Sequence, residues 1–160
     1  MLDVNQIAPD FTLKMFGNGE MSFYASAGPL NSVLIFYKFS CGTSRFTFPF
    51  LQKIYDAYAH SVYFAAIAQD NAEQTAKFRE ELGITIPILL DENPYPVSRA
   101  YGIHTVPSIF LVDPERKIRF SSYGFVKQDI LNLSDILAEK SGAEQVDVFE
   151  SAEVPEIKPG

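Results

Sequence analysis

The chain has 160 residues, of which 47% are hydrophobic and 21% charged, and its formal net charge at pH 7 is −7. This length and composition are ordinary for one folded domain with a core of its own. The acidic balance disfavours nucleic acids and anionic lipid surfaces as partners, because both would repel it, and no run approaches the ~20 apolar residues that span a bilayer.

The chain begins with a loop-rich stretch of residues 1–30. Met1-Leu2-Asp3-Val4 has neither the charged start nor the apolar centre of an export signal, so we expect a cytoplasmic protein. Pro9 to Leu13 is a short extended piece between turn signals. Val33 to Tyr37 is then a continuous apolar run, which is typical of a central strand covered on both faces.

A long helix is predicted after this strand, from Thr43 to about His60. Its apolar residues recur every four positions, which gives the helix one apolar face. Val62 to Ala68 is a second buried strand, and Asn71 to Leu82 is a helix that Gly83 ends. The apolar face of the long helix comprises Phe46, Phe50, Ile54 and Tyr58.

The second half of the chain adds another strand, a hairpin and a closing helix. Ile86 to Leu90 is a third apolar run, and Ser108 to Val112 and Ile118 to Ser122 flank a turn-like link, as in a hairpin of antiparallel strands. Gln128 to Lys140 has helical apolar spacing. Strands that alternate with helices and end in a hairpin and a helix predict an α/β fold, with a central mixed β-sheet flanked by helices.

The sequence loses its periodicity after Gly142 and becomes acidic. Glu150 to Gly160 contains two prolines and three glutamates, and so reads as an extended segment rather than a packed element. We therefore divide the chain into one domain, residues 1–142, and an acidic, proline-containing extended tail, residues 143–160.

Cys41 is the only cysteine, so no intrachain disulfide can form, which suits a reducing compartment. It lies at a strand-to-helix junction, where unpaired N–H groups and the positive end of the helix dipole favour a thiolate. The motif Cys41-Gly42-Thr43-Ser44 reads as a C-x-x-C redox site reduced to one thiol, within a small polar turn. Gly42, Thr43 and the positive charge of Arg45 are the candidates that support the thiolate. An inert, buried cysteine is the alternative, because free cysteines are often core residues.

Pro107 stands immediately before the apolar strand that begins at Ser108. A proline in this position commonly marks the start of a strand, where it breaks no ladder hydrogen bond. The sharper interpretation is a cis peptide bond between Val106 and Pro107, a form found in ~5–6% of such bonds.

Taken together, these segments resemble a known family. The chain is similar to the thioredoxin-like superfamily, in the branch that joins membrane-tethered thiol-disulfide reductases with alkyl hydroperoxide reductase and thiol-specific antioxidant proteins. The resemblance covers roughly residues 5–140 and implies a thioredoxin-like fold. It rests on Ala8-Pro9-Asp10-Phe11-Thr12-Leu13, an apolar strand, Cys41-Gly42-Thr43-Ser44-Arg45, Phe48-Pro49 and Thr105-Val106-Pro107-Ser108-Ile109-Phe110-Leu111-Val112-Asp113.

The resemblance also implies roles for residues outside the cysteine motif. It implies that Pro107 is cis and lies against the reactive sulfur, and that Val106, with Thr105, offers backbone groups to a bound peptide. Asp70 matches an acidic residue of the reductases that assists proton transfer at the thiols. Its simpler interpretation is an N-cap for the helix that begins near Asn71.

Three positions depart from the family pattern. Ser44 replaces the second cysteine, and its hydroxyl can donate a hydrogen bond to a thiolate or cap the helix. Ser40 stands where the reductases usually have tryptophan. Leu34 and Lys38 occupy the places where the peroxidases have a proline and a threonine or serine.

The leading hypothesis is a thiol-disulfide oxidoreductase that acts through Cys41 alone and forms a mixed disulfide with a disulfide-bearing protein. Without a second cysteine, release needs an external thiol reductant such as glutathione or thioredoxin. The first alternative is a one-cysteine peroxidase, an antioxidant that reduces peroxides through a sulfenic acid. The second is a redox-inactive binding module whose groove beside Val106 and Pro107 holds a peptide.

Metal and cofactor signatures are not found in the sequence. Two histidines and one cysteine, widely spaced, do not form a zinc motif, and Asp91-Glu92-Asn93 lacks the spacing of a calcium loop. No glycine-rich phosphate loop occurs. We therefore expect no metal and no cofactor.

Overall fold

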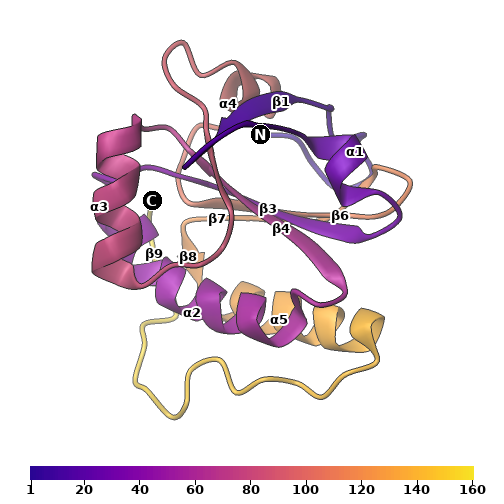
Figure 1. The fold of residues 1–160 in the computed structure, drawn as a ribbon. Helices are drawn as coiled ribbons and strands as arrows, with labels where there is room; N and C mark the ends of the chain where they lie inside the picture. The colour runs from indigo at the N-terminus through magenta and orange to yellow at the C-terminus, as the bar shows by residue number, and fades with distance from the viewer.

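The computed structural model describes residues 1–160, as a mixed β-sheet with helices on both faces (Figure 1). No helix combines the length and the apolarity needed to cross a membrane. The helices are α1 (Phe23–Ala27), α2 (Gly42–Tyr58), α3 (Ala72–Leu82), α4 (Pro96–Ala100) and α5 (Lys127–Ser141). The strands are β1 (Thr12–Met15), β2 (Glu20–Ser22), β3 (Asn31–Tyr37), β4 (Val62–Ala68), β5 (Ile88–Leu90), β6 (Ser108–Val112), β7 (Ile118–Tyr123), β8 (Phe125–Val126) and β9 (Ile157–Lys158).

The main sheet has seven strands in the order β2-β1-β5-β4-β3-β6-β7, and β8 and β9 form a separate pair. β3 lies in its interior, parallel to β4 and antiparallel to β6. All its residues from Ser32 to Tyr37 are buried, as expected for an apolar strand covered on both faces. The register pairs Phe36 with Ser108, so the carboxyl end of β3 lies beside the start of β6.

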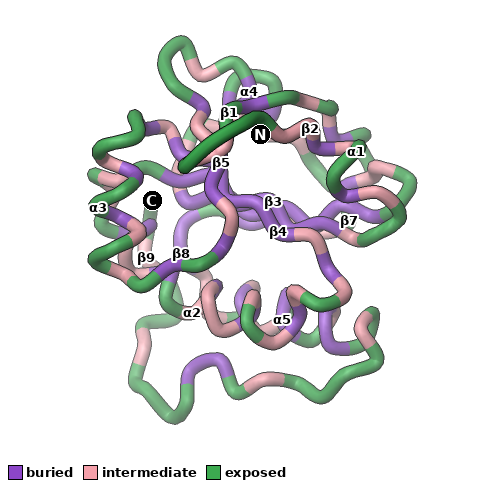
Figure 2. Tube along the Cα trace, viewed as in Figure 1, coloured by how far each residue is buried: buried purple, intermediate pink, exposed green.

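Two apolar clusters fill the two faces of the sheet, and Figure 2 shows the buried strands between them. On one face, α2 and α5 pack through residues such as Ile54 and Leu133, and α3 adds Phe78. On the other face, α1 and α4 cover the sheet with Phe23 and Val97. The structure therefore confirms the predicted α/β fold with helices on both faces.

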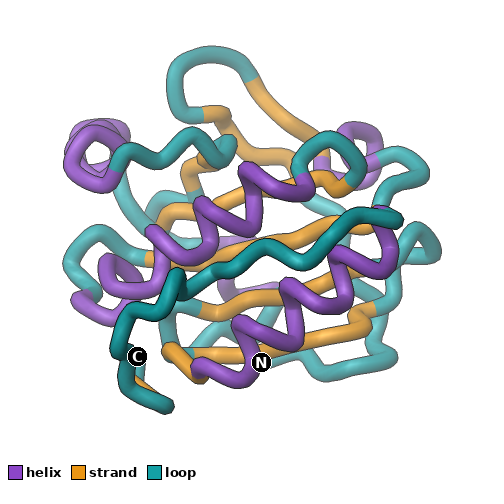
Figure 3. Tube along the Cα trace, turned by 90° about the horizontal axis from the view of Figure 1, so that it is seen from below, coloured by secondary structure: helices purple, strands orange, loops and turns teal.

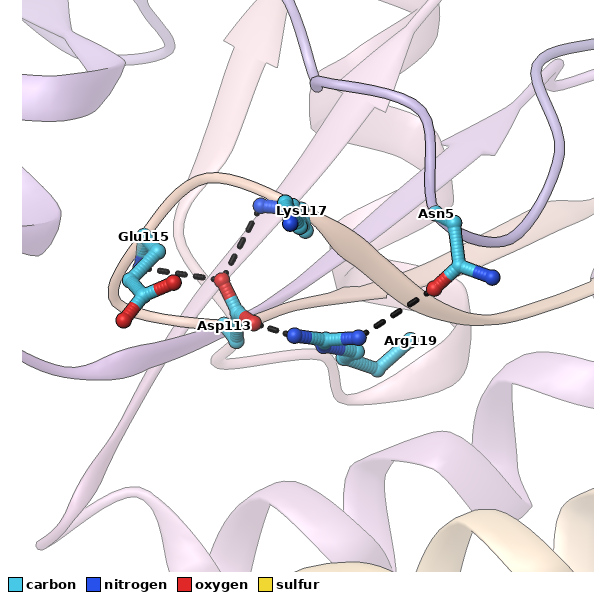
Figure 4. A network of polar contacts seen from close by, with 5 residues as sticks. All are labelled: Asn5, Asp113, Glu115, Lys117 and Arg119. Carbon is cyan, nitrogen blue, oxygen red and sulfur yellow. Dashed lines mark hydrogen bonds and ion pairs between the residues drawn. The ribbon is translucent and has the colours of Figure 1, made fainter.

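The turn between β6 and β7 is organised by Asp113 (Figure 4). Its Oδ1 accepts hydrogen bonds from the backbone N–H groups of Glu115 and Lys117, at 2.9 and 3.0 Å. Its Oδ2 accepts from Nε of Arg119 at 2.6 Å, and Arg119 also donates to Asn5 at 3.2 Å. Burial alone would raise the pKa of Asp113, but these hydrogen bonds and the charge of Arg119 outweigh it, so the pKa lies below its usual value.

The amino-terminal stretch contains more regular structure than the sequence indicated. β1 and β2 form an antiparallel pair, and β1 extends the sheet by pairing with β5. These strands have four and three residues. Such short strands carry too little alternation to be recognised, and their pairing with β5 depends on residues far along the chain.

Residues 143–160 are mostly exposed, but they are not the wholly unpacked tail that we expected, because a few of them pack on the domain. The segment runs back between α2 and α5 (Figure 3), and Val148 and Phe149 are buried in the cluster beneath these helices. Tyr58 accepts a hydrogen bond from the N–H of Val146 at 3.0 Å. Two apolar residues and a tyrosine hydroxyl therefore fix an otherwise acidic stretch.

Candidate functional site

Cys41 is the N-cap residue of α2, directly after the loop that follows β3. Its Sγ accepts a hydrogen bond from the backbone N–H of Ser44 at 3.3 Å. The sulfur thus takes one of the N–H groups that a helix leaves unpaired at its start, at the positive end of a 17-residue helix. Its half-buried side chain remains accessible. The sulfur therefore lies at a helix N-terminus, in a residue that is only half buried.

The same sulfur contacts the loop that carries Pro107. Its thiol donates a hydrogen bond to the carbonyl oxygen of Val106 at 3.3 Å, and the peptide bond between Val106 and Pro107 is cis. The antiparallel pairing of β3 with β6 explains this contact, because it brings the end of β3 beside the start of β6. The two segments singled out in the sequence therefore meet at one sulfur.

Ser44 and Gly42 occupy opposite environments in the first turn of α2. Ser44 is fully buried, and its hydroxyl has no hydrogen-bond partner. It is therefore not the helix cap that we considered, since Cys41 has that place. Gly42 is exposed, and nothing lies within 4 Å of the position that a Cβ would take there.

Arg45 is directed toward α3 rather than toward the thiol. Its guanidinium forms an ion pair with Glu81 and lies over the ring of Phe39, 5.3 Å from the ring centroid. Thr43 is buried, and its hydroxyl donates to the carbonyl oxygen of Pro159 at 2.5 Å. Neither side chain has a hydrogen bond with Cys41, so the sulfur receives its support from the helix backbone.

Asp70 lies just after β4, and 4% of its surface is exposed. Its Oδ2 accepts a hydrogen bond from the backbone N–H of Phe39 at 2.7 Å, so it holds the loop that leads to Cys41. Burial raises the pKa of Asp70, while the bond from Phe39 and the charge of Lys38 oppose the shift. The interpretation of Asp70 as the cap of α3 is wrong, because Asn71 caps this helix with Gln74 in a capping box.

A third chain segment reaches the site, and the sequence analysis did not anticipate it. We call residues 156–160 the covering segment. The backbone N–H of Lys127 donates to the carbonyl oxygen of Glu156 at 2.8 Å, and β9 then pairs with β8 (Figure 1). The segment continues to Pro159, which accepts the hydrogen bond from Thr43. Two paired residues in an acidic stretch give no periodic signal, so sequence reasoning had no means of finding it.

Titratable side chains outside this site do not gather into a metal centre, since no group of three or more His, Cys, Asp or Glu residues could hold an ion. His104, close to Pro107 in sequence, is exposed. The chemistry that the site offers is therefore that of one sulfur, a helix N-terminus and the backbone of the Val106 loop.

The sequence of this chain is similar to those of known proteins. The AhpC/TSA family model matches residues 4–121, more than half of the chain. The thiol-disulfide oxidoreductase ResA of Geobacillus thermodenitrificans is 29% identical over an alignment of 132 residues, which covers 79% of this chain and 74% of ResA.

Two solved structures show the same fold. A candidate protein disulfide isomerase from Bacteroides thetaiotaomicron superposes with a TM-score of 0.80 at 21% identity, over 89% of this chain and 92% of its own. The thioredoxin domain of a thiol-disulfide oxidoreductase from Bacteroides vulgatus gives 0.76 at 24% identity, over 85% and 98%. The fold is therefore thioredoxin-like.

Proposed function

The chain belongs to the AhpC/TSA family, and on this premise we propose that it is a thiol-disulfide oxidoreductase that acts through the single thiol of Cys41. One observation carries the proposal: the sulfur of the half-buried Cys41 lies 3.3 Å from both the backbone nitrogen of Ser44 and the carbonyl oxygen of Val106. An inert core cysteine would be sealed among apolar side chains, without a helix N-terminus beside it.

The first half of the reaction forms a mixed disulfide. The thiolate of Cys41 attacks one sulfur of the substrate disulfide; the substrate S–S bond breaks as the new S–S bond forms, and the other substrate sulfur leaves as a thiolate that takes a proton from water. The N–H of Ser44 stabilises the attacking thiolate. Thr105 and Val106 supply backbone groups for an extended peptide substrate, next to Pro107.

The second half needs external thiols, because Ser44 has a hydroxyl where a resolving thiol would act. The first thiol takes the place of the substrate on Cys41 and frees the substrate as a thiol. The second thiol attacks the sulfur of the first, which frees Cys41 as a thiol and joins the two external thiols in a disulfide. Glutathione or thioredoxin fits this role, and the cytoplasmic location expected from the sequence would supply both. Reductant and location remain predictions.

Asp70 acts in this proposal as a positioning residue. Its carboxylate holds the N–H of Phe39, two residues before Cys41, and so fixes the loop on which the sulfur is carried. Proton transfer by Asp70, which the family resemblance implies, remains a prediction.

The arrangement favours disulfide exchange over peroxide reduction. A peroxidase needs polar donors that stabilise the leaving oxygen, but Leu34 is buried in the core and the hydroxyl of Thr43 is bonded to Pro159. A redox-inactive binding module would leave the contact between Cys41 and the helix N-terminus without a use.

The test is to incubate the reduced protein with oxidised glutathione and measure its mass. We expect one glutathione adduct, on Cys41, that thioredoxin or reduced glutathione reverses. Cys41→Ser is the control and should remain unmodified. If the adduct forms no faster than it does on free cysteine, the proposed activity is contradicted. Rapid consumption of hydrogen peroxide would favour the peroxidase instead.

A further inference from the structure

The covering segment contacts the groups on both sides of the reactive sulfur. Pro159 accepts a hydrogen bond from Thr43, two residues after Cys41. Gly160 lies against Thr105 and the carbonyl oxygen of Val106, so closely that a Cβ on Gly160 would collide with both. Since Val106 is also the hydrogen-bond partner of Cys41, the segment occupies the place at which a substrate would approach the sulfur.

A strand-like backbone pairing holds the segment there. β9 lies antiparallel to β8, with Phe125 opposite Lys158 and Val126 opposite Ile157. Gly124 has a φ of 67°, and a Cβ added there would lie 2.9 Å from the carbonyl oxygen of Lys158. A glycine at this position therefore lets the segment pass close to the chain before α5.

Side-chain contacts add less to this pairing than the backbone does: Nζ of Lys158 lies over the ring of Phe46, 5.2 Å from the ring centroid, and the other contacts are exposed. Lys127 and Glu156 form an ion pair at 3.7 Å in which the Glu156 side chain is 79% exposed, and the Ile157 side chain is mostly exposed. Such exposed contacts contribute little stability. The segment is thus held mainly through its backbone, as any extended peptide could be.

Displacement of the covering segment from the site would expose a continuous groove. The covering segment forms one wall of a cavity of about 700 Å³, whose other walls are Met1–Asp3 and Ser121–Gly124. Thr105, in the loop beside Cys41, also lines this cavity. Without the covering segment, the cavity and the accessible side of the sulfur would form one surface.

We propose that residues 156–160 are an intramolecular occupant of a strand-accepting site, and that polypeptide substrates must displace them from β8 to reach Cys41. This inference rests on the proposed function for its meaning, since it describes how access to the same thiol is regulated. It assigns the substrate class as an extended protein segment with a small residue beside Val106. Small flexible molecules would not need to displace the strand, whereas a polypeptide or a bulky reagent would.

The experiment measures the rate at which a bulky maleimide alkylates Cys41 in the reduced protein. Removal of residues 156–160 leaves Val148 and Phe149 in the core, so the truncated protein should keep its fold. Loss of a few net backbone hydrogen bonds should raise the alkylation rate about tenfold. Equal rates for the truncated and full chains would overturn the proposal.

A pair of proline variants tests the strand pairing in the full chain. In an antiparallel pair, hydrogen-bonded positions alternate, so the bond from Lys127 to Glu156 makes Phe125 and Lys158 the next bonded pair. Lys158→Pro removes the N–H of that pair. Cys41 in this variant should be alkylated about as fast as in the truncated protein. Ile157→Pro places a proline where the replaced N–H faces away from β8, so the alkylation rate of Cys41 should stay close to that of the parent protein. Equal acceleration by both prolines would contradict the strand pairing.

Adding the segment back separates this proposal from the proposed function. A synthetic peptide with the sequence of residues 153–160 should slow alkylation of the truncated protein, and the same peptide with proline at the position of Lys158 should not. If these results hold but oxidised glutathione forms no adduct, the covering segment is confirmed and the oxidoreductase activity fails. If the adduct forms but neither truncation nor peptide alters alkylation, the reverse is true.

Discussion

At the scale of single residues, the proposed function makes Ser44 the residue that prevents the protein from releasing its own mixed disulfide. Ser44→Cys restores the C-x-x-C spacing beside the N–H that already contacts Cys41. We expect the variant to form an intrachain disulfide on mild oxidation, and to release bound glutathione without added reductant. The measurement is the number of alkylated thiols, by mass, before and after reduction.

Thr43→Cys is the matched control for this prediction. It also adds one thiol to the same turn, but the Thr43 side chain points to Pro159 and lies two rather than three residues from Cys41. This variant should keep both thiols free under the same oxidation. Disulfide formation to the same extent in the two variants would show that turn flexibility, not the position of residue 44, controls the pairing.

Asp70 gives a prediction about pH. Its pKa is raised in the folded protein, so the protonated form favours folding; that stability is fully present below the usual carboxyl value of 3.8 and is lost as the pH rises through the folded pKa. Asp70→Asn mimics the protonated form and can still accept from the N–H of Phe39. It should be more stable than the parent at pH 7, with an advantage that disappears toward pH 4, measured by urea unfolding.

Asp70→Ala separates the charge of Asp70 from its hydrogen bond. It leaves the N–H of Phe39 without its partner, which should cost about 1–3 kcal/mol. If the asparagine variant is no more stable than the parent at pH 7, the carboxylate is stabilised by something other than the contacts described here.

At the scale of elements, long periodic segments could be predicted and short ones could not. α2 and β4 agree with the predicted ranges to within about one or two residues, because each carries enough apolar repeats to reveal its period. The helix after Asn71 was also predictable, since Gly83 marks its end, although its N-cap was assigned to Asp70 instead of Asn71. β8 and β9 have two residues each, and pairing across the chain, not local sequence, makes them strands.

The Asp113 turn supports a prediction at this scale. Asp113→Ala removes the acceptor for two backbone N–H groups and Arg119, so the free energy of unfolding should fall by about 2 kcal/mol at pH 7. Because the folded pKa of Asp113 is lowered, its contribution is present above the usual value of 3.8 and is lost as the pH falls through the folded pKa. The difference between variant and parent should therefore shrink in acid.

Arg119→Ala tests whether the ion pair alone accounts for this effect. The Arg119 side chain is 42% exposed, so its loss should cost less than about 1 kcal/mol. A cost equal to that of Asp113→Ala would mean that the ion pair, rather than the backbone hydrogen bonds, holds the turn.

At the scale of the whole molecule, the family resemblance implied that the loop of Pro107 would lie beside Cys41, but not what covers the two. The meeting follows from the fold, because β3 and β6 are neighbours in the sheet. The ion pair of Arg45 with Glu81 and the return of residues 143–160 were not predictable. Both depend on which surfaces the folded domain leaves free, and this is decided only after the sheet and helices have packed.

Phe149 tests whether this return is part of the folded structure. It is 7% exposed, and its ring centroid lies 4.9 Å from the ring centroid of Phe50 and 6.2 Å from that of Phe125. Phe149→Ala should lower the free energy of unfolding by about 3 kcal/mol, because a buried aromatic side chain is lost and a cavity remains. The measurement is urea unfolding of the full chain.

The comparison variants locate that stability within residues 143–160. Glu150→Gln removes only the ion pair with Lys53, in which the Glu150 side chain is 68% exposed, and should change stability by less than about 0.5 kcal/mol. Removal of residues 156–160 should cost about 1.4 kcal/mol, the free energy that corresponds to tenfold protection of Cys41, since it leaves Phe149 in place. If Phe149→Ala costs as little as these two changes, the segment lies on the domain without contributing to its core. If truncation costs as much as Phe149→Ala, the covering segment is part of the core and could not leave Cys41 without unfolding, because the two regions would then be stabilised together.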